Sequence, residues 1–155
     1  MKKRFLVCFL TVLLFCAGVV IAGERATKEE CVSKCKEVAK LIQEKGINAA
    51  VEAIMASGSP YMWKDSYVFM IDMNGLTLAH PASPKLVGQN VTNFKDANGK
   101  LFVAEYMAVA KEKGEGWVDY MWLVPGTKEV KPKQTYVYKV PGKDAIVLAG
   151  IYNYE

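Results

Sequence analysis

The stretch SYVFMIDMNGLTLAH, residues 66–80, decides the fold class of this chain. Within residues 66–72 β-branched and aromatic side chains alternate, which is typical of a strand. Asn74 and Gly75 supply the left-handed backbone that a tight hairpin turn needs, and we interpret Asp72 as a residue of that turn. Residues 76–80 then return as the partner strand. We therefore predict an antiparallel β-hairpin.

Three more strands are expected after the hairpin, at residues 117–124, 133–140 and 145–151. The last of these runs is almost entirely apolar, so its strand should lie at the centre of the sheet. A polar connection over residues 81–99 separates the hairpin from the later elements. Loops of this kind often cover ligands.

Helical segments are expected around these strands. Residues 27–30 form a capping-box pattern, and the helix that starts there should end near Gly46. Asn48 is expected to cap a second helix over residues 49–56. A third helical stripe comprises Phe102, Tyr106, Val109 and Ala110. This order predicts an α+β fold in which an antiparallel five-stranded sheet carries a long N-terminal helix and flanking helices.

The first 22 residues look like a targeting segment. Three basic residues, 2–4, precede an uncharged apolar run over residues 5–22, which ends in Val-Ile-Ala. We predict a signal peptide over residues 1–22, cleaved after Ala22, and export to the periplasm. The alternative is an uncleaved membrane anchor, because 18 apolar residues are just enough to span a bilayer.

Charge excludes one class of partner. Without residues 1–22, 17 of the 20 basic residues remain against 16 acidic ones, so the mature domain is nearly neutral. The electrostatic footprint of a nucleic-acid-binding protein is therefore missing. The 155 residues, 52% of them hydrophobic, suit one packed domain.

Two cysteines remain in the mature chain. Cys31 and Cys35 fall on the apolar stripe of the first helix, together with Val38, Ala39 and Ile42. Two residues four apart on one helix fit disulfide geometry poorly, so we predict that they do not bond to each other within the helix. Their role stays open.

A series of phrases carries a resemblance to a known family. In chain order they are residues 63–69 (WKDSYVF), 72–75 (DMNG) with 79–81 (AHP), 114–120 (GEGWVDY), 132–136 (PKQTY) and 149–152 (AGIY). This series resembles single Cache domains of the second type, over roughly residues 27–152. The resemblance implies one PAS-like ligand-binding domain over residues 27–155, with a pocket for small ligands, often carboxylates.

Domains of this family form the extracytoplasmic halves of bacterial chemoreceptors and histidine kinases, between two membrane spans. This sequence stops at Glu155, directly after the last predicted strand. The expectation is thus an exported binding module without a transmitter of its own, which presents a small organic ligand to a separate membrane receptor or transporter. The alternative is a structural or interaction protein with a vestigial pocket that forms a homodimer through its N-terminal helix.

An enzyme is the least favoured class. His80 is the only histidine, and the sequence holds no Ser-His-Asp set, no zinc-ligand spacing and no Cys-x-x-Cys-His site for haem. We therefore expect no catalytic residue, no metal and no cofactor.

Candidate ligand-binding residues follow from strand periodicity. His80 ends the second strand and could donate a hydrogen bond to a ligand oxygen, or could instead be structural and bond the following loop. Two strand faces offer an aromatic wall, through Tyr67 with Phe69 and through Tyr120 with Trp122.

Two further positions complete the predicted pocket. Lys133 and Thr135 share a face at the start of their strand, so an ammonium and a hydroxyl can reach one carboxylate, unless this is a solvated strand end. Lys133 is expected to be the principal anchor and to be solvated in the empty protein, so that truncation weakens binding far more than folding. Trp63 could close the pocket, whereas Trp117 has the opposite parity and should belong to the core.

Overall fold

The computed structural model describes residues 23–153, so the predicted signal peptide lies outside the described residues. The helices are α1 (Lys28–Lys45), α2 (Ile47–Met55) and α3 (Phe102–Glu112), with a short 3-10 turn η1 (Pro84–Leu86). The strands are β1 (Met62–Trp63), β2 (Ser66–Ile71), β3 (Thr77–Ala79), β4 (Glu115–Leu123), β5 (Val130–Lys139) and β6 (Ile146–Tyr152). The predicted α+β class is confirmed.

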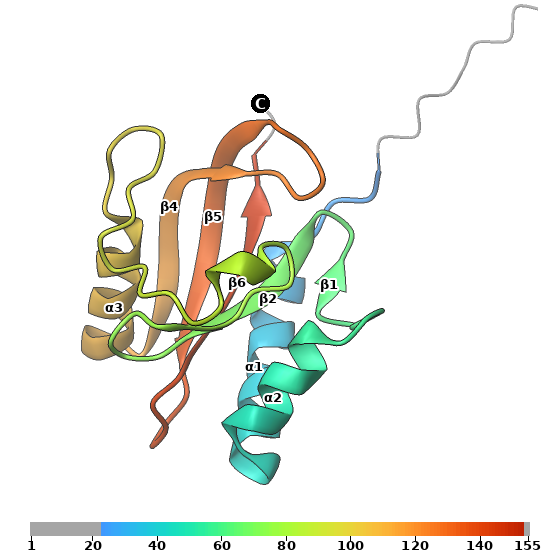
Figure 1. Ribbon diagram of the computed structural model, residues 1–155, viewed down its shortest axis with the longest axis vertical. Helices are drawn as coiled ribbons and strands as arrows, with labels where there is room; N and C mark the ends of the chain where they lie inside the picture. The colour runs from blue at the N-terminus through green and yellow to red at the C-terminus, as the bar shows by residue number, and fades with distance from the viewer. Residues whose placement is uncertain (1–22, 154–155) are drawn as a thin grey trace, which may run out of the picture.

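All strand pairs are antiparallel, and the order across the sheet is β1-β2-β6-β5-β4, with β3 beside β2. Figure 1 shows this order from β4 on the left to β1 on the right. The apolar strand β6 lies at the centre, as predicted. The described part of the sheet has six strands and not five, because β1 was not expected. Two residues are too few to show an alternating pattern.

The predicted hairpin forms from β2 and β3, but its turn differs from the expected one. Gly75 has the left-handed backbone (φ 81°), whereas Asn74 does not. The Asp72 carboxylate accepts hydrogen bonds of 2.8 Å from the backbone nitrogens of Asn74 and Leu76. Asp72 is therefore the turn residue that the sequence indicated, and the turn needs only one glycine.

The N-terminal helix starts where the capping box predicts. Thr27 Oγ1 accepts from the backbone nitrogen of Glu30 at 3.2 Å, and the Glu30 carboxylate accepts from the backbone nitrogen of Thr27 at 2.9 Å. The predicted cap of the second helix is wrong. Gly46, at φ 88°, separates α1 from α2, and Asn48 lies inside the first turn of α2. Glycine is one of the residues favoured at an N-cap, although it offers no side-chain acceptor.

The sheet separates two hydrophobic cores. One core contains the buried stripe of α1, including Cys31 and Cys35, with α2 and alternate residues of β2, β5 and β6. The other lies against α3 and the 81–101 connection.

Within residues 23–153 no helix is long and apolar enough to cross a bilayer. The α3 face carries the candidate site.

Candidate functional site

Lys133 lies at the centre of a polar cluster on the α3 face of the sheet. Its Nζ donates a 3.0 Å hydrogen bond to the hydroxyl oxygen of Tyr67 on β2. Trp122 of β4 donates to the same oxygen through Nε1, also at 3.0 Å. The Lys133 ammonium lies over the rings of Tyr67, Tyr152 and Phe69, at 4.1, 4.9 and 5.6 Å from their centroids. The fold thus gathers one cation among aromatic faces.

The prediction that Lys133 is solvated is wrong, because the side chain is only 1% exposed. Strand β5 begins at Val130, three residues earlier than expected, and pairs Lys133 with Tyr120 on one side and Tyr152 on the other. Gly150 on β6 leaves the space for this side chain. A Cβ at Gly150 would lie 2.8 Å from Lys133 Cε.

The buried ammonium has no acidic partner in the part of the chain that the structure describes. None of the ion pairs within residues 23–153 involves Lys133. A buried charge without a counter-ion is costly, and proteins pair such charges or bind ligands with them. The Tyr67 oxygen already accepts two hydrogen bonds, so the hydrogen of its own hydroxyl is left to donate. The cluster therefore offers donors to an anion.

His80 lies beside this cluster, as predicted. Its ring centroid is 5.0 Å from that of Tyr67 and 5.1 Å from that of Phe69, and the side chain is 4% exposed. Burial and the charge of Lys133 lower the pKa of His80 to about 3, so the ring is neutral near pH 7. Its Nδ1 atom has no hydrogen-bond partner among the described residues.

Hydroxyl groups form the third part of the cluster. The hydroxyls of Tyr120 and Thr135 share a hydrogen bond of 3.1 Å. Tyr106 of α3 places its hydroxyl beside them, yet makes no hydrogen bond of normal geometry within residues 23–153. Burial raises the pKa of Tyr120 to about 12 and that of Tyr106 well above its usual value, so both phenols keep their protons. Sequence reasoning placed Tyr106 on an apolar stripe and missed its hydroxyl.

A cavity of about 30 Å³ adjoins the cluster. Trp122 and Leu86 line both this cavity and an outer groove of about 250 Å³ between η1 and the β4–β5 loop. The hydrogen bond between Trp122 and Tyr67 thus lies between the inner cavity and the outside. The inner cavity is lined by Phe69, Ile71, Thr77, His80, Leu86, Val91, Phe94, Phe102, Val103, Tyr106, Tyr120 and Trp122.

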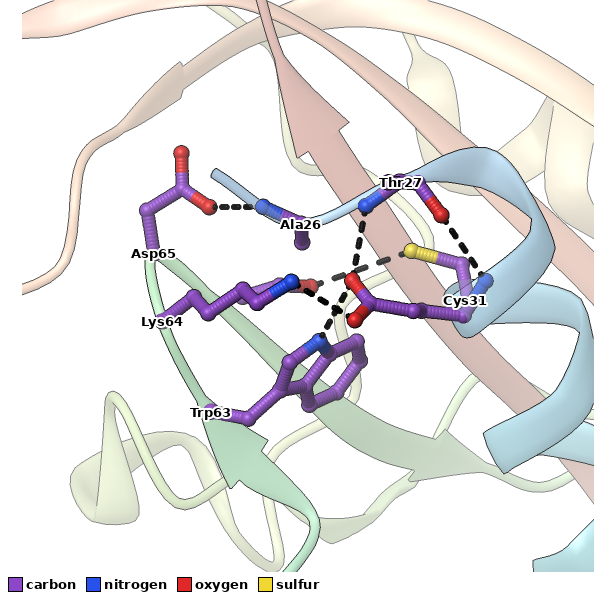
Figure 2. A network of polar contacts seen from close by, with 8 residues as sticks. Ala26, Thr27, Cys31, Trp63, Lys64 and Asp65 are labelled. Carbon is purple, nitrogen blue, oxygen red and sulfur yellow. Dashed lines mark hydrogen bonds and ion pairs between the residues drawn. The ribbon is translucent and has the colours of Figure 1, made fainter. Parts of the chain in front are cut away.

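Trp63 is the one predicted site residue that the structure does not bring to this cluster. It pairs with Ser66, and cross-strand partners share a face, so both lie on the α1 side of the sheet. The Trp63 indole donates to the Glu30 carboxylate at 3.3 Å, beside the 2.7 Å ion pair of Lys64 with Glu30. Figure 2 shows Trp63 and Lys64 pointing toward the start of α1. Trp117 packs on the α1 side too, as its parity predicted.

The two cysteines lie on the α1 side as free thiols, and neither is exposed. Burial raises the pKa of Cys31 to about 11 and that of Cys35 well above its usual value. Cys31 Sγ lies 3.9 Å from the hydroxyl oxygen of Ser66. Residues 23–153 contain no group of three His, Cys, Asp or Glu side chains placed to hold a metal ion. The candidate site is therefore the cationic, donor-rich cluster on the α3 face.

Relatives of the chain include a chemotaxis protein and a sensor histidine kinase. It is 31% identical over 88 residues to the methyl-accepting chemotaxis protein McpP of Pseudomonas putida, an alignment that covers 57% of this chain and 16% of that protein. It is 32% identical over 89 residues to the sensor histidine kinase MctS of Rhizobium johnstonii, covering 57% of this chain and 19% of that protein. The aligned part is thus less than a fifth of either relative.

A solved structure described as "Structural basis for carboxylic acid recognition by a Cache chemosensory domain" superposes with a TM-score of 0.68. It is 27% identical, and the match covers 78% of this chain and 87% of that one. The family described as "Single Cache domain 2" matches residues 29–155. The chain belongs to this family of sensor domains, and its PAS-like antiparallel sheet agrees with that.

Proposed function

We propose that this domain binds a small organic carboxylate, without transforming it, and that Lys133 is the anchor for the carboxylate. The observation that carries the proposal is the buried ammonium, 1% exposed, with no acidic partner among residues 23–153. Tyr67 and Trp122 add donors, and Phe69, Tyr120, Thr135 and His80 enclose the same space. An anion of low charge would satisfy this cluster.

The relatives support the same class of function. One solved relative is described by its recognition of carboxylic acids, and the two curated relatives are a chemotaxis receptor and a sensor kinase. We propose that residues 1–22 direct export to the periplasm and that the liganded domain acts with a membrane receptor or transporter. The nearly neutral mature domain suits a small ligand better than a polyanion.

Access from the outer groove to the inner cavity requires Trp122 to move. The inner cavity, about 30 Å³, holds roughly two water molecules and is too small for a whole organic acid. Trp122 separates this cavity from the 250 Å³ outer groove through one hydrogen bond to Tyr67. A carboxylate oxygen can accept from Trp122 Nε1 in place of the Tyr67 oxygen, and so replace that bond. This movement would open the inner cavity to the groove between η1 and the β4–β5 loop.

The test compares acids with their uncharged isosteres. Propionate and propionamide have nearly the same shape, so a difference between them reports the anion site. At about a hundred times its dissociation constant, a ligand adds roughly 2.7 kcal/mol to the folded state, which raises the melting temperature by several degrees. We expect such a shift with at least one small carboxylate and none with its amide. Equal shifts with acid and amide, or no shift across a panel of two- to five-carbon acids, would refute the proposal.

A further inference from the structure

We propose that the site selects small acids that carry a hydroxyl or keto oxygen on the carbon next to the carboxylate. This inference rests on the proposed carboxylate-binding function. It concerns two polar atoms that the anion itself does not explain. These are Nδ1 of His80 and the hydroxyl oxygen of Tyr106, which lack hydrogen-bond partners within residues 23–153.

Both atoms are deeply buried and line one cavity. The side chains of His80 and Tyr106 are 4% and 1% exposed, and they come from the end of the hairpin and from α3. Both line the inner cavity of about 30 Å³, whose other walls are mostly aromatic and aliphatic. Buried polar atoms are nearly always bonded in native proteins, so two in one cavity call for a specific partner.

The chemistry of the two groups fits an oxygen substituent. His80 is neutral near pH 7, because its pKa is lowered to about 3, and a neutral imidazole has one donor and one acceptor nitrogen. Tyr106 keeps its proton and can donate. A ligand hydroxyl can both donate and accept, and a keto oxygen can accept from either group. A plain alkyl group would leave both atoms unsatisfied.

The location of His80 beside Tyr67 places this oxygen next to the carboxylate. The His80 ring is 5.0 Å from the Tyr67 ring, and the Lys133 ammonium lies 4.1 Å from the centroid of that same Tyr67 ring. The His80 member of the polar pair is therefore about one ring away from the anchor. The free volume of about 30 Å³ exceeds the roughly 10–15 Å³ that one water-sized group needs. One oxygen atom fits there, and a longer polar chain does not.

Lactate and propionate give the matched test, because they differ only by one hydroxyl. We expect calorimetry on the purified protein to show lactate binding about tenfold or more tightly than propionate, since a site built around a hydroxyl discriminates strongly against its absence. Tyr106→Phe should remove most of this preference by weakening lactate, with propionate unchanged. Tyr136→Phe is the control, because Tyr136 is a similarly buried tyrosine on the α1 face.

Each outcome decides the inference. Equal affinities for the two acids would overturn the selectivity and leave the carboxylate function standing. Tyr106→Phe that weakens both acids equally would show that Tyr106 is structural, and would overturn its assignment. Failure of lactate and pyruvate to bind, while another acid of the two- to five-carbon panel binds, would overturn this inference alone, and no binding across the whole panel would refute the proposed function with it. Melting curves of both variants close to that of the wild type exclude unfolding as the cause.

Discussion

Replacing Lys133 by methionine separates the role of the charge from the role of the side chain's volume. Methionine fills a similar space and removes the ammonium, whereas alanine removes both. In the empty protein the ammonium makes one hydrogen bond, to Tyr67, and lies over three aromatic rings. No carboxylate within residues 23–153 compensates it. The two variants should therefore differ sharply.

The expected magnitudes follow from this environment. Lys133→Met loses a charge-assisted hydrogen bond of about 1.5–3 kcal/mol, but it also relieves a desolvation cost of several kcal/mol. We expect the ligand-free Met variant to be as stable as the wild type, or more stable. Lys133→Ala should lose about 2–5 kcal/mol, because it leaves a cavity in the core. Both variants should bind the cognate carboxylate about ten- to a hundredfold more weakly.

The assay pairs urea denaturation without ligand with calorimetry of the best carboxylate. Lys143→Met serves as a control, because Lys143 is an exposed lysine on the β5–β6 turn and should change neither measurement. If the ligand-free Lys133→Met variant lost about 3–5 kcal/mol of unfolding free energy, the loss would match the cost of breaking a buried ion pair. That result would show that Lys133 already has a counter-ion, and it would refute the reasoning.

Three further expectations concern the same fold. The pKa of His80 is lowered from 6.5 to about 3 in the folded protein, so as the pH drops the unfolded state takes up a proton on His80 before the folded state does. The free energy of unfolding should therefore fall by about 1.4 kcal/mol per pH unit between pH 6.5 and pH 3. The urea midpoint of His80→Gln should change less with pH than that of the wild type, and an equal change with pH in the two proteins would contradict this. Gly150→Ala should cost about 1–3 kcal/mol by overpacking and should weaken ligand binding. Thermal melts should show a smaller loss of stability for Gly116→Ala than for Gly150→Ala, because a Cβ at Gly116 meets only the Val109 side chain. Equal losses in the two variants would contradict the close packing around Gly150. Cys31 and Cys35 should resist a thiol reagent at pH 8 until the protein unfolds, since with a pKa of about 11 only on the order of one Cys31 in a thousand is a thiolate. Labelling of the native protein at the rate of an exposed cysteine would exclude a buried pair.

Local signals in the sequence predicted most elements of the fold. The capping box at Thr27, the Asp72 turn and the apolar run of β6 each act through nearby residues, and each was found where expected. The start of β5 was missed because Pro132 looks like a strand boundary. In the structure Pro132 lies inside β5, and its carbonyl oxygen accepts from the backbone nitrogen of Asn153, just beyond the end of β6. Tertiary pairing overrode the local signal and buried Lys133.

The candidate site shows a different limit of sequence reasoning. Alternation along a strand states which residues of that strand share a face, and it grouped Tyr67 with Phe69, Tyr120 with Trp122 and Lys133 with Thr135. It does not state which strands are neighbours. Tyr67 meets Lys133 across 66 positions of sequence because β6 packs between β2 and β5. For Tyr106, helical periodicity indicated burial, but only the packing of α3 on β4 brings its hydroxyl to the cavity.

The step from Ser66 to Tyr67 joins the two faces of the sheet. Tyr67 points to the polar cluster on the α3 face, where it accepts from Lys133. Ser66 points to α1, donates a 2.6 Å hydrogen bond to the carbonyl oxygen of Gly150 and lies beside Cys31. Gly150 in turn leaves the space for the Lys133 side chain. Lys133 and Cys31 of α1 therefore contact consecutive residues of β2, and Gly150 lies next to Lys133 while it accepts from Ser66.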